Sequence, residues 1–540
     1  MPETPDRPSR GERPDRGGPG GQRPDRSGPR GQRPDRGSTG GRPGGPDGTR
    51  APARERLRQA DAPRTAAYQV LREVDGNDAY ANLVLPGVLA RHRLAGRDAG
   101  FATELTYGTL RMRGLYDAVL ATLVDRPLAM LDAATLDVLR LGTHQLLAMR
   151  VPDHAAVAST VGLARQEVGT GASGLVNAVL RKVPERDLAG WQELLAPHAP
   201  AAPDGTPGVE GDAALAVRHS HPEWVVRALR QALVGHGRSP AELEALLAAD
   251  NAPADVSLLA RPGLLDVADL LADGGRAGTW SPFAVTMDSG SPGGLRAVRE
   301  SRARVQDEGS QLVAAALVGA GLDGAAASSV LDGAADHRGE RWLDLCAGPG
   351  GKSSLLSALA RRDGASGVAV ELAPHRARLV EQAVRGAEDV WQVRTGDGRT
   401  VGEDEPGGYD RALVDAPCTG LGALRRRPEA RWRRTPGDLA GLAGLQRSLL
   451  ASALGAVRPG GVVAYVTCSP HLAETTAVVE DTVRRAAKDG TQVEVLDAAA
   501  VLDAAVGREV TGSAAGPHVQ LWPHAHGTDG MFLALLRRGA

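Results

Sequence analysis

Cysteine and long apolar runs are scarce in this chain, and each scarcity excludes a class of protein. The three cysteines among 540 residues, Cys346, Cys418 and Cys468, are too few for a disulfide framework and fit a reducing compartment. No run of about eighteen apolar residues occurs, so no membrane span is expected. The opening MPETPDRPSR lacks the apolar centre of a secretory signal. We therefore expect a cytoplasmic protein without a membrane partner.

The N-terminal segment, residues 1–62, is of low complexity and rich in Arg, Gly and Pro. The tetrapeptide RPDR recurs at Arg13, Arg23 and Arg33. Such a segment buries too little apolar surface to offset its ordering entropy, which predicts a disordered tail. A weak, salt-sensitive contact between its arginines and RNA is the alternative, although interleaved aspartates oppose it. The net charge of the whole chain, −2, indicates no partner.

The rest of the chain divides into three parts by its apolar periodicity. Residues 63–197 carry apolar residues at three- and four-residue spacing, as in SGLVNAVLRKV, which predicts an all-helical domain. Residues 212–302 mix helical and strand patterns and predict a small α+β subdomain. Residues 303–540 alternate short branched runs (RWLDLC, GVAVEL, VWQVRT, DRALVDA, GVVAYVT) with helical patterns. That alternation predicts a Rossmann-like α/β domain around a parallel sheet.

The first predicted strand of this domain ends in a glycine-rich turn, WLDLCAGPGGKSSLL. A phosphate loop needs a glycine where Cys346 stands, and a dinucleotide fingerprint needs one at Ser353, so both matches are partial. The turn from Cys346 through Ala347, Gly348, Pro349, Gly350 and Gly351 to Lys352 instead predicts a backbone cradle for another ligand. The N-terminus of the following helix would face that ligand.

Acidic residues follow the later strands of the domain in order. Glu371 ends the second strand, Asp397 follows the third, and Asp415 follows the fourth. Any one of them could be a loop or helix-cap carboxylate. The ordered set fits an adenosine ligand at the carboxyl edge of the sheet, and S-adenosylmethionine is the natural candidate.

Two of the three cysteines also stand at strand ends, Cys418 in DAPCTG and Cys468 in YVTCSP. A cysteine taken singly is more often a small buried apolar residue. A thiol matters to a methyl donor because C5 of cytosine is a weak nucleophile. A thiolate that adds at C6 makes C5 nucleophilic, and a second thiol can act as acid or base when the adduct breaks down. Asp415 near N3 of the base would stabilise the adduct.

These motifs resemble a known family. LDLCAGPGGKSS, DAPCTGLGALRRRPEARWRR, YVTCSPHLAETTAVVE and LWPHAHGTDGMFLALL are similar to the RNA (cytosine-5) methyltransferases of the RsmB/Sun class. VQDEGSQLVAAAL resembles the segment that leads into their core. The helical residues 64–184 resemble the NusB-like RNA-binding domain that precedes the catalytic domain in bacterial 16S ribosomal RNA methyltransferases.

The resemblance implies a role for each motif residue. Cys468 is the implied nucleophile, and Cys418 is implied to assist release of the methylated base. This order matters because in DNA cytosine methyltransferases the Pro-Cys cysteine is the nucleophile. Residues Cys346 to Lys352, Glu371, Asp397 and Asp415 match the cofactor contacts of the family. Glu371 stands where the family often has Asp, and Gly309 where it often has Ala; we expect little effect of either.

An arginine-rich segment follows Cys418. LRRRPEARWRR contains six arginines, and such a run is usually a solvated helix face. Beside a catalytic turn we expect a clamp on RNA phosphates, made by Arg425, Arg426, Arg427, Arg431, Arg433 and Arg434. The spacing of the histidines and cysteines does not match a metal site, so no metal is expected.

The sequence thus predicts a monomeric enzyme that uses S-adenosylmethionine to methylate C5 of a cytosine in 16S ribosomal RNA. The same chemistry on transfer RNA or another ribosomal RNA is one alternative. A non-catalytic RNA-binding or antitermination factor with a NusB-like domain is another, and the presence of both motif cysteines opposes it.

Overall fold

A computed structural model describes residues 61–77, 79–196, 211–287, 292–331, 333, 336–511 and 516–539 of the chain. Residues 1–60 of the expected N-terminal tail lie outside the described residues. Across the described ranges, no helix is both long and apolar enough to cross a membrane.

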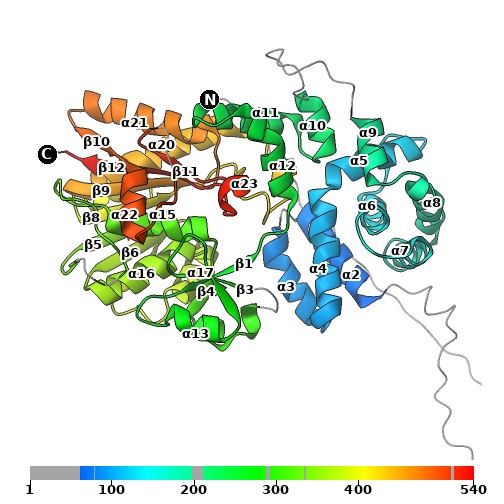
Figure 1. Cartoon of the computed structure of the whole chain (residues 1–540), viewed down its shortest axis with the longest axis horizontal. Coiled ribbons are helices and arrows are strands. Elements are labelled where there is room, and N and C mark those ends of the chain that lie inside the picture. The colour runs from blue at the N-terminus through cyan, green and yellow to red at the C-terminus, as the bar shows by residue number, and fades with distance from the viewer. Residues whose placement is uncertain are drawn as a thin grey trace, which may run out of the picture. The chain divides into compact units, whose positions relative to one another are not determined.

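The first described part of the chain is all helical, as its periodicity predicts (Figure 1). The side chain of Asp61 caps the first helix by accepting a hydrogen bond from the Arg64 amide at 3.1 Å. The long amphipathic stretch 101–124 is divided at Met112, which ends one helix and starts the next. Apolar faces from these helices form one core that includes Leu105, Leu139 and Leu180. The helices are α2 (Ala62–Gly76), α3 (Ala81–Arg91), α4 (Gly96–Arg111), α5 (Arg113–Leu123), α6 (Ala133–Leu147), α7 (Asp153–Glu167), α8 (Thr170–Leu180) and α9 (Leu188–Leu195).

Three helices and a small antiparallel sheet follow. The helices are α10 (Asp212–Arg218), α11 (Glu223–Gly235) and α12 (Leu243–Asn251). The sheet has the order β2-β3-β1-β4, with β1 (Val256–Ala260), β2 (Gly275–Ala277), β3 (Ala284–Met287) and β4 (Ala303–Val305), and the short helices α13 (Val267–Ala272) and α14 (Arg296–Arg299) lie between its strands. Because Ala303 pairs with Ala260, the sheet extends across the boundary expected between residues 302 and 303. That boundary is corrected to a position after Val305.

The last part is built on an eight-stranded sheet of order β10-β12-β9-β8-β5-β6-β7, with β11 paired to β12. The strands are β5 (Arg341–Asp344), β6 (Ser366–Glu371), β7 (Trp391–Thr395), β8 (Tyr409–Asp415), β9 (Val457–Thr467), β10 (Val493–Leu496), β11 (Val519–Gln520) and β12 (Phe532–Arg538). Strands β5 to β9 run parallel, and β12 is antiparallel to β9. Strands β6 and β7 are added on one side of β5, and β8 and β9 on the other. The crevice for a ligand therefore lies at the carboxyl ends of the strands beside β5. The predicted Rossmann-like fold is confirmed.

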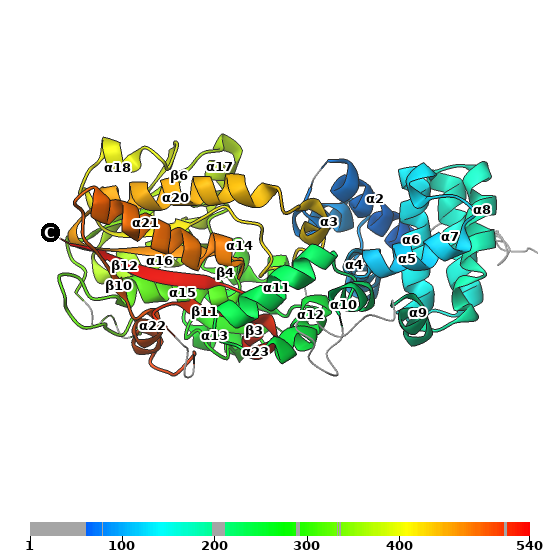
Figure 2. The ribbon, with the colours of Figure 1, turned by 90° about the horizontal axis from the view of Figure 1, so that it is seen from above.

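Helices cover both faces of this sheet (Figures 1 and 2). Alternate strand residues point to opposite faces, as Trp342 and Leu343 do in β5. One face packs on α15 (Glu308–Gly319), α16 (Gly351–Asp363), α17 (Pro374–Ala383) and α22 (Ala498–Val506), and the other on α18 (Val401–Asp404), α20 (Asp438–Ala456) and α21 (Thr476–Lys488). Two further short helices are α19 (Ala430–Arg433) and α23 (Pro523–His526).

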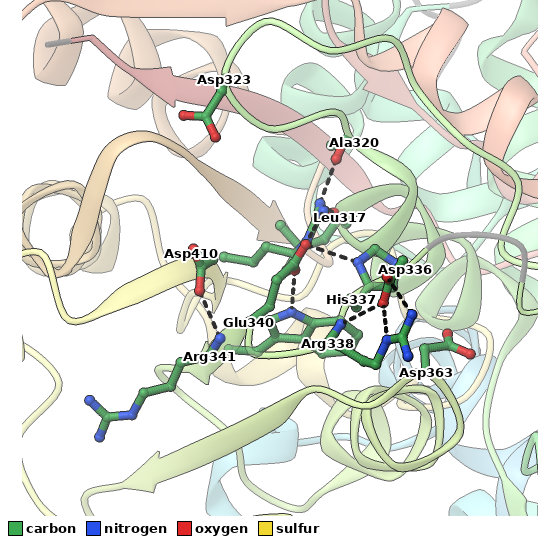
Figure 3. Close-up of polar contacts among 12 residues, drawn as sticks. Leu317, Ala320, Asp323, Asp336, His337, Arg338, Glu340, Arg341, Asp363 and Asp410 are labelled. Carbon is green, nitrogen blue, oxygen red and sulfur yellow. Dashed lines mark hydrogen bonds and ion pairs between the residues drawn. The ribbon is translucent and has the colours of Figure 1, made fainter.

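A buried ion pair lies where the parallel strands begin, on the side of the sheet opposite their carboxyl ends. Arg411 of β8 is 3% exposed and donates to Glu340 at 2.7 Å and to the Leu317 carbonyl of α15 at 2.8 Å. Glu340 also accepts hydrogen bonds from His337 and from the Trp342 indole (Figure 3). Burial opposes ionisation of Glu340, but the hydrogen bonds from His337 and Arg411 outweigh it and lower its pKa to about 2. The pair therefore fastens α15 to β5 and β8.

We expect Glu340→Gln to lower the free energy of unfolding by about 3–5 kcal/mol, because it leaves the Arg411 guanidinium buried without a counter-charge. The pKa of Glu340 is lower in the folded than in the unfolded chain. Its contribution is therefore complete above pH 4.5 and is lost as the pH falls toward about 2. Urea titrations at several pH values would measure both effects, and the variant should lose less stability across that interval than wild type. Glu403→Gln, at an exposed position of α18, is the control, and equal midpoints for the two variants would contradict the assignment.

Candidate active site

The carboxyl ends of the five parallel strands bring the expected site residues to one edge of the sheet. Glu371 and Asp415 are the last residues of β6 and β8, and Cys468 directly follows β9. Asp397 lies two residues beyond β7, and the glycine turn follows β5. Sequence segments that are more than a hundred residues apart thus meet because parallel strands end on the same side.

The glycine turn packs so closely on the neighbouring protein that side chains would not fit at two of its positions. Gly350 caps α16 with φ +96°, and a Cβ atom on it would lie 2.5 Å from the Ala383 methyl group. A Cβ on Gly348 would lie 2.4 Å from the Glu371 carboxylate. The Gly348 amide donates to that carboxylate at 3.0 Å, which ties the turn to the end of β6.

Asp344, the last residue of β5, presents a buried oxygen to this turn. Its Oδ2 accepts a hydrogen bond from the Ser353 hydroxyl at 2.5 Å, whereas Oδ1 finds no hydrogen-bond partner among the described residues. Burial raises the pKa of Asp344 to about 7. A buried acceptor without a partner is costly, so this oxygen fits a donor on a ligand. The turn and Asp344 together fit the amino-acid end of S-adenosylmethionine.

Lys352, at the end of the glycine turn, pairs with Asp415, the last residue of β8. Lys352 is buried, and its Nζ donates to Asp415 Oδ2 at 2.7 Å. Burial disfavours the charged form, but the Asp415 carboxylate outweighs it and raises the pKa of Lys352. The pair is neutral as a whole and lies near Cys468, whose pKa Asp415 raises and Lys352 lowers.

The other two acids, Glu371 and Asp397, differ in their burial. Glu371 is buried and pairs with Arg376 at 3.0 Å. Asp397 is about one-third exposed and pairs with Arg399, which lowers its pKa. Asp397 is therefore the more accessible of the two.

The sulfur atoms of Cys418 and Cys468 lie 3.4 Å apart, at hydrogen-bond distance. Both residues are half-buried and neither forms a disulfide. The contact between the two sulfurs lowers the pKa of Cys468 and raises the pKa of Cys418. Burial and Asp415 oppose the Cys468 thiolate, whereas Arg427 and Lys352 also favour it. Cys468 is thus the better nucleophile of the pair, and Cys418 the better proton donor.

Cys346 does not belong to this pair. Burial raises the pKa of its thiol, and the nearby carboxylates of Asp344 and Asp415 act in the same direction. A thiol that keeps its proton is a poor nucleophile. The structure therefore agrees with a place for Cys346 in the cofactor turn and not in covalent chemistry.

The arginine run after Cys418 is not the solvent-facing clamp that its composition suggests. All six arginines are buried or half-buried. Arg425 and Arg426 approach Asp307 and Asp529, with the Arg426–Asp307 distance at 2.8 Å. Their guanidinium groups are used inside the protein, so the RNA-phosphate prediction was wrong for these two residues.

Arg431 is the most deeply buried member of the run, with no exposed surface. It donates to Asn251 Oδ1 at 2.8 Å and to the Ser220 carbonyl at 3.1 Å. Burial lowers its pKa to about 10. Its phosphate assignment was also wrong, because carbonyl and amide oxygens of the α10–α12 region already occupy the guanidinium.

The end of the same run contacts the helical domain. Arg433 donates to the Val74 carbonyl at 2.7 Å, and Glu429 accepts from the Ala81 amide at 3.0 Å. The Arg427 and Arg433 guanidinium groups lie 5.1 and 5.2 Å from the centre of the Tyr80 ring. The run therefore joins the loop of Cys418 to helices α2 and α3.

Two residues of the site were missed from the sequence. Leu372, directly after Glu371, is an apolar side chain that is 67% exposed at the carboxyl edge. Glu474 is fully buried beside both cysteine loops. Leu372 could have been found from its position directly after an acid at a strand end. No feature of the neighbouring sequence indicates that Glu474 is part of the site. Among the described residues, no group of three or more His, Cys, Asp or Glu side chains could hold a metal ion.

A sheet of this order, with a glycine turn after β5 and acids after the next strands, defines a Rossmann-like S-adenosylmethionine-dependent methyltransferase. The family models agree with that class: the 16S rRNA methyltransferase RsmB/F model matches residues 334–537, and the NusB family model matches residues 61–185. The chain belongs to the RsmB/F methyltransferase family, and it is an S-adenosylmethionine-dependent RNA methyltransferase.

Individual relatives cover most of the chain. A Mycobacterium tuberculosis (strain H37Rv) protein, named a methyltransferase without a stated substrate, is 50% identical over 89% of this chain and 98% of its own length. The ribosomal RNA small subunit methyltransferase B of Pseudomonas putida is 32% identical over 77% of this chain and 88% of its own. The crystal structure of PH0851 has the same fold, with a TM-score of 0.68 and 20% identity over 88% of this chain and 98% of that chain.

Proposed function

We propose that the enzyme transfers a methyl group from S-adenosylmethionine to C5 of a cytosine in 16S ribosomal RNA through a covalent adduct with Cys468. The observation that carries the proposal is the pair of sulfur atoms 3.4 Å apart at the crevice beside the glycine turn. The names of the ribosomal RNA relatives support the substrate. We further propose that it acts as a cytoplasmic monomer.

The cofactor supplies an electrophilic methyl group when bound. We assign its amino-acid end to Asp344 and to the turn from Cys346 to Lys352, where a buried oxygen is available. Glu371 and Asp397 would hold the ribose and the adenine edge, and the exposed Leu372 would cover an adenine face. Asp415 lies between this site and the cysteines, since it pairs with Lys352 and influences Cys468.

The reaction follows from the two thiols. The Cys468 thiolate forms a bond to C6 of the base, and the electrons of the C5–C6 double bond move into the ring, where a proton held between N3 and Asp415 would stabilise them. C5 then forms its bond to the methyl carbon as the bond from that carbon to the donor sulfur breaks, and the demethylated cofactor is the leaving group. A base removes the C5 proton, the C6–S bond breaks, the double bond re-forms, and Cys468 leaves as a thiolate. Cys418 is in hydrogen-bond contact with that sulfur, and we assign it the role of acid or base during release.

The RNA surface includes residues near the thiols. Arg427 and Arg434 are half-buried and are the members of the arginine run that we still propose for phosphate contacts, while Arg433 serves mainly the helical domain. The target base must leave its stack to reach Cys468, which single-stranded RNA allows at least cost.

The test is transfer of labelled methyl groups from S-adenosylmethionine to protein-free 16S RNA, followed by digestion to nucleosides. We expect the label in 5-methylcytidine, with transfer RNA as the parallel substrate. Label in transfer RNA alone would overturn the substrate, and label in another nucleoside would overturn the chemistry. RNA binding without any transfer would favour a non-catalytic RNA-binding factor.

A further inference from the structure

A buried carboxylate, Glu474, lies between the two loops that carry the cysteines. It ends the short helix η5 (Leu472–Glu474) and has no exposed surface. Its Oε1 accepts the Thr419 amide at 2.8 Å, and its Oε2 accepts the Thr419 hydroxyl. Oε2 also accepts the Ser469 hydroxyl at 2.7 Å. Thr419 directly follows Cys418 and Ser469 directly follows Cys468, so one carboxylate holds both loops.

Hydrogen bonds from neighbouring elements hold Glu474 in place. Gln446 of α20 donates to Oε1 at 3.2 Å and to the Pro417 carbonyl at 2.8 Å. The Tyr465 hydroxyl of β9 donates to the main-chain carbonyl of Glu474 at 2.7 Å. The two loops are also joined directly, since the Gly422 amide donates to the Cys468 carbonyl at 2.9 Å. The two oxygens of the carboxylate together therefore accept from α20, from the Cys418 loop and from the Cys468 loop.

Four donors converge on the two oxygens, which suits a carboxylate, whereas an amide would require the Thr419 and Ser469 hydroxyls to turn and accept. Among the described residues, every hydrogen-bond partner of the two oxygens is an N–H or O–H group, and an ionised carboxyl group only accepts. A glutamine at this position would place an NH2 group against some of these donors. The charged and titratable groups that face the two sulfurs are Asp415 of β8, Lys352 of α16, Arg427 of the arginine run, Glu474 of η5 and the neutral phenol of Tyr465 in β9. Asp415 disfavours a negative charge on either sulfur, Glu474 disfavours one on Cys418, and Arg427 and Lys352 favour one on Cys468.

We propose that Glu474 is a positioning residue, which holds the two thiols in contact and keeps Cys418 as the protonated member of the pair. It acts through Thr419 and Ser469 and does not touch the base. The inference rests on the proposed covalent function for its purpose, but its geometry is independent of the RNA. It explains why an acid is buried at this point although no basic side chain is among its hydrogen-bond partners.

The experiment uses the full chain with Glu474→Gln, which preserves shape and removes the charge. Each thiol is alkylated with iodoacetamide over a range of pH, and the modified peptides of Cys418 and Cys468 are quantified by mass spectrometry. Since the thiolate is the reactive form, wild type should be alkylated preferentially at Cys468, and the variant should lose at least about threefold of that preference. Methyl transfer should fall about a hundredfold in kcat through misplacement of the thiols, with the KM for S-adenosylmethionine within about twofold of wild type. Glu480→Gln, an exposed position of α21, is the matched control and should behave as wild type.

Each outcome decides the inference. Unchanged alkylation preference in a folded Glu474→Gln variant overturns it, even where activity falls, because a purely structural role would leave the preference intact. Should that variant not fold, Ser469→Ala removes one link to the carboxylate and must shift the preference in the same direction, or the inference fails. Alkylation requires no RNA. A shifted preference in an enzyme that makes no 5-methylcytidine would therefore sink the proposed function and leave the role of Glu474 standing.

Discussion

Cys468→Ala is expected to abolish methyl transfer, with a loss of at least about a thousandfold in kcat. Without a thiolate to add at C6, C5 of the base cannot attack the methyl donor. The neighbouring Cys418 cannot substitute, because burial and the carboxylates of Glu474 and Asp415 still raise its pKa without Cys468, and its sulfur lies 3.4 Å away on the other loop. Transfer of labelled methyl groups to 16S RNA under single-turnover conditions measures the loss of the chemical step itself.

The same variant should bind S-adenosylmethionine as wild type does, because Cys468 follows β9 whereas the glycine turn follows β5. Isothermal titration with the cofactor analogue sinefungin provides that control. Residual activity within about tenfold of wild type would show that another group adds to the base, and the roles assigned to the two thiols would then have to be exchanged.

The sequence was sufficient to place the acids and cysteines at one edge of the sheet. Glu371, Asp415 and Cys468 stand at or next to strand ends, and parallel strands bring such positions together whatever the lengths of the intervening helices. The contact between the two sulfurs was not predictable in the same way. It depends on the conformations of two loops, and those are set by hydrogen bonds between distant residues, such as the bond from Gly422 to Cys468.

The arginine run shows where composition misleads. Runs of charge usually face solvent, yet Arg431 is fully buried. Its partners are the Asn251 side-chain oxygen and main-chain carbonyls of Ser220 and Asp250, from segments at least 180 residues earlier. Carbonyl groups leave no mark on a sequence, so an arginine that they satisfy looks the same as one that awaits a phosphate. Glu474 was missed for the same reason, because its partners are identified by the fold and not by spacing.

Cys418→Ala is expected to trap the enzyme on its product. Cys468 can still add to C6 and C5 can still take the methyl group, but the proton steps of release lose the only other thiol at hydrogen-bond distance among the described residues. Turnover should fall by about a hundredfold or more, as for loss of a general acid or base. A covalent protein–RNA species that survives denaturing electrophoresis should accumulate with labelled methyl groups in it.

The adduct separates release from addition, which the loss of activity alone does not. In Cys418→Ala the species should carry one methyl group per enzyme and should disappear in the double variant with Cys468→Ala, because the bond to RNA is made by the Cys468 sulfur. The hydrogen bond that lowers the pKa of Cys468 is also lost in Cys418→Ala, so addition should shift to higher pH in that variant. An adduct that persists in the double variant, or one that forms in Cys468→Ala alone, would assign the nucleophile to a residue other than Cys468.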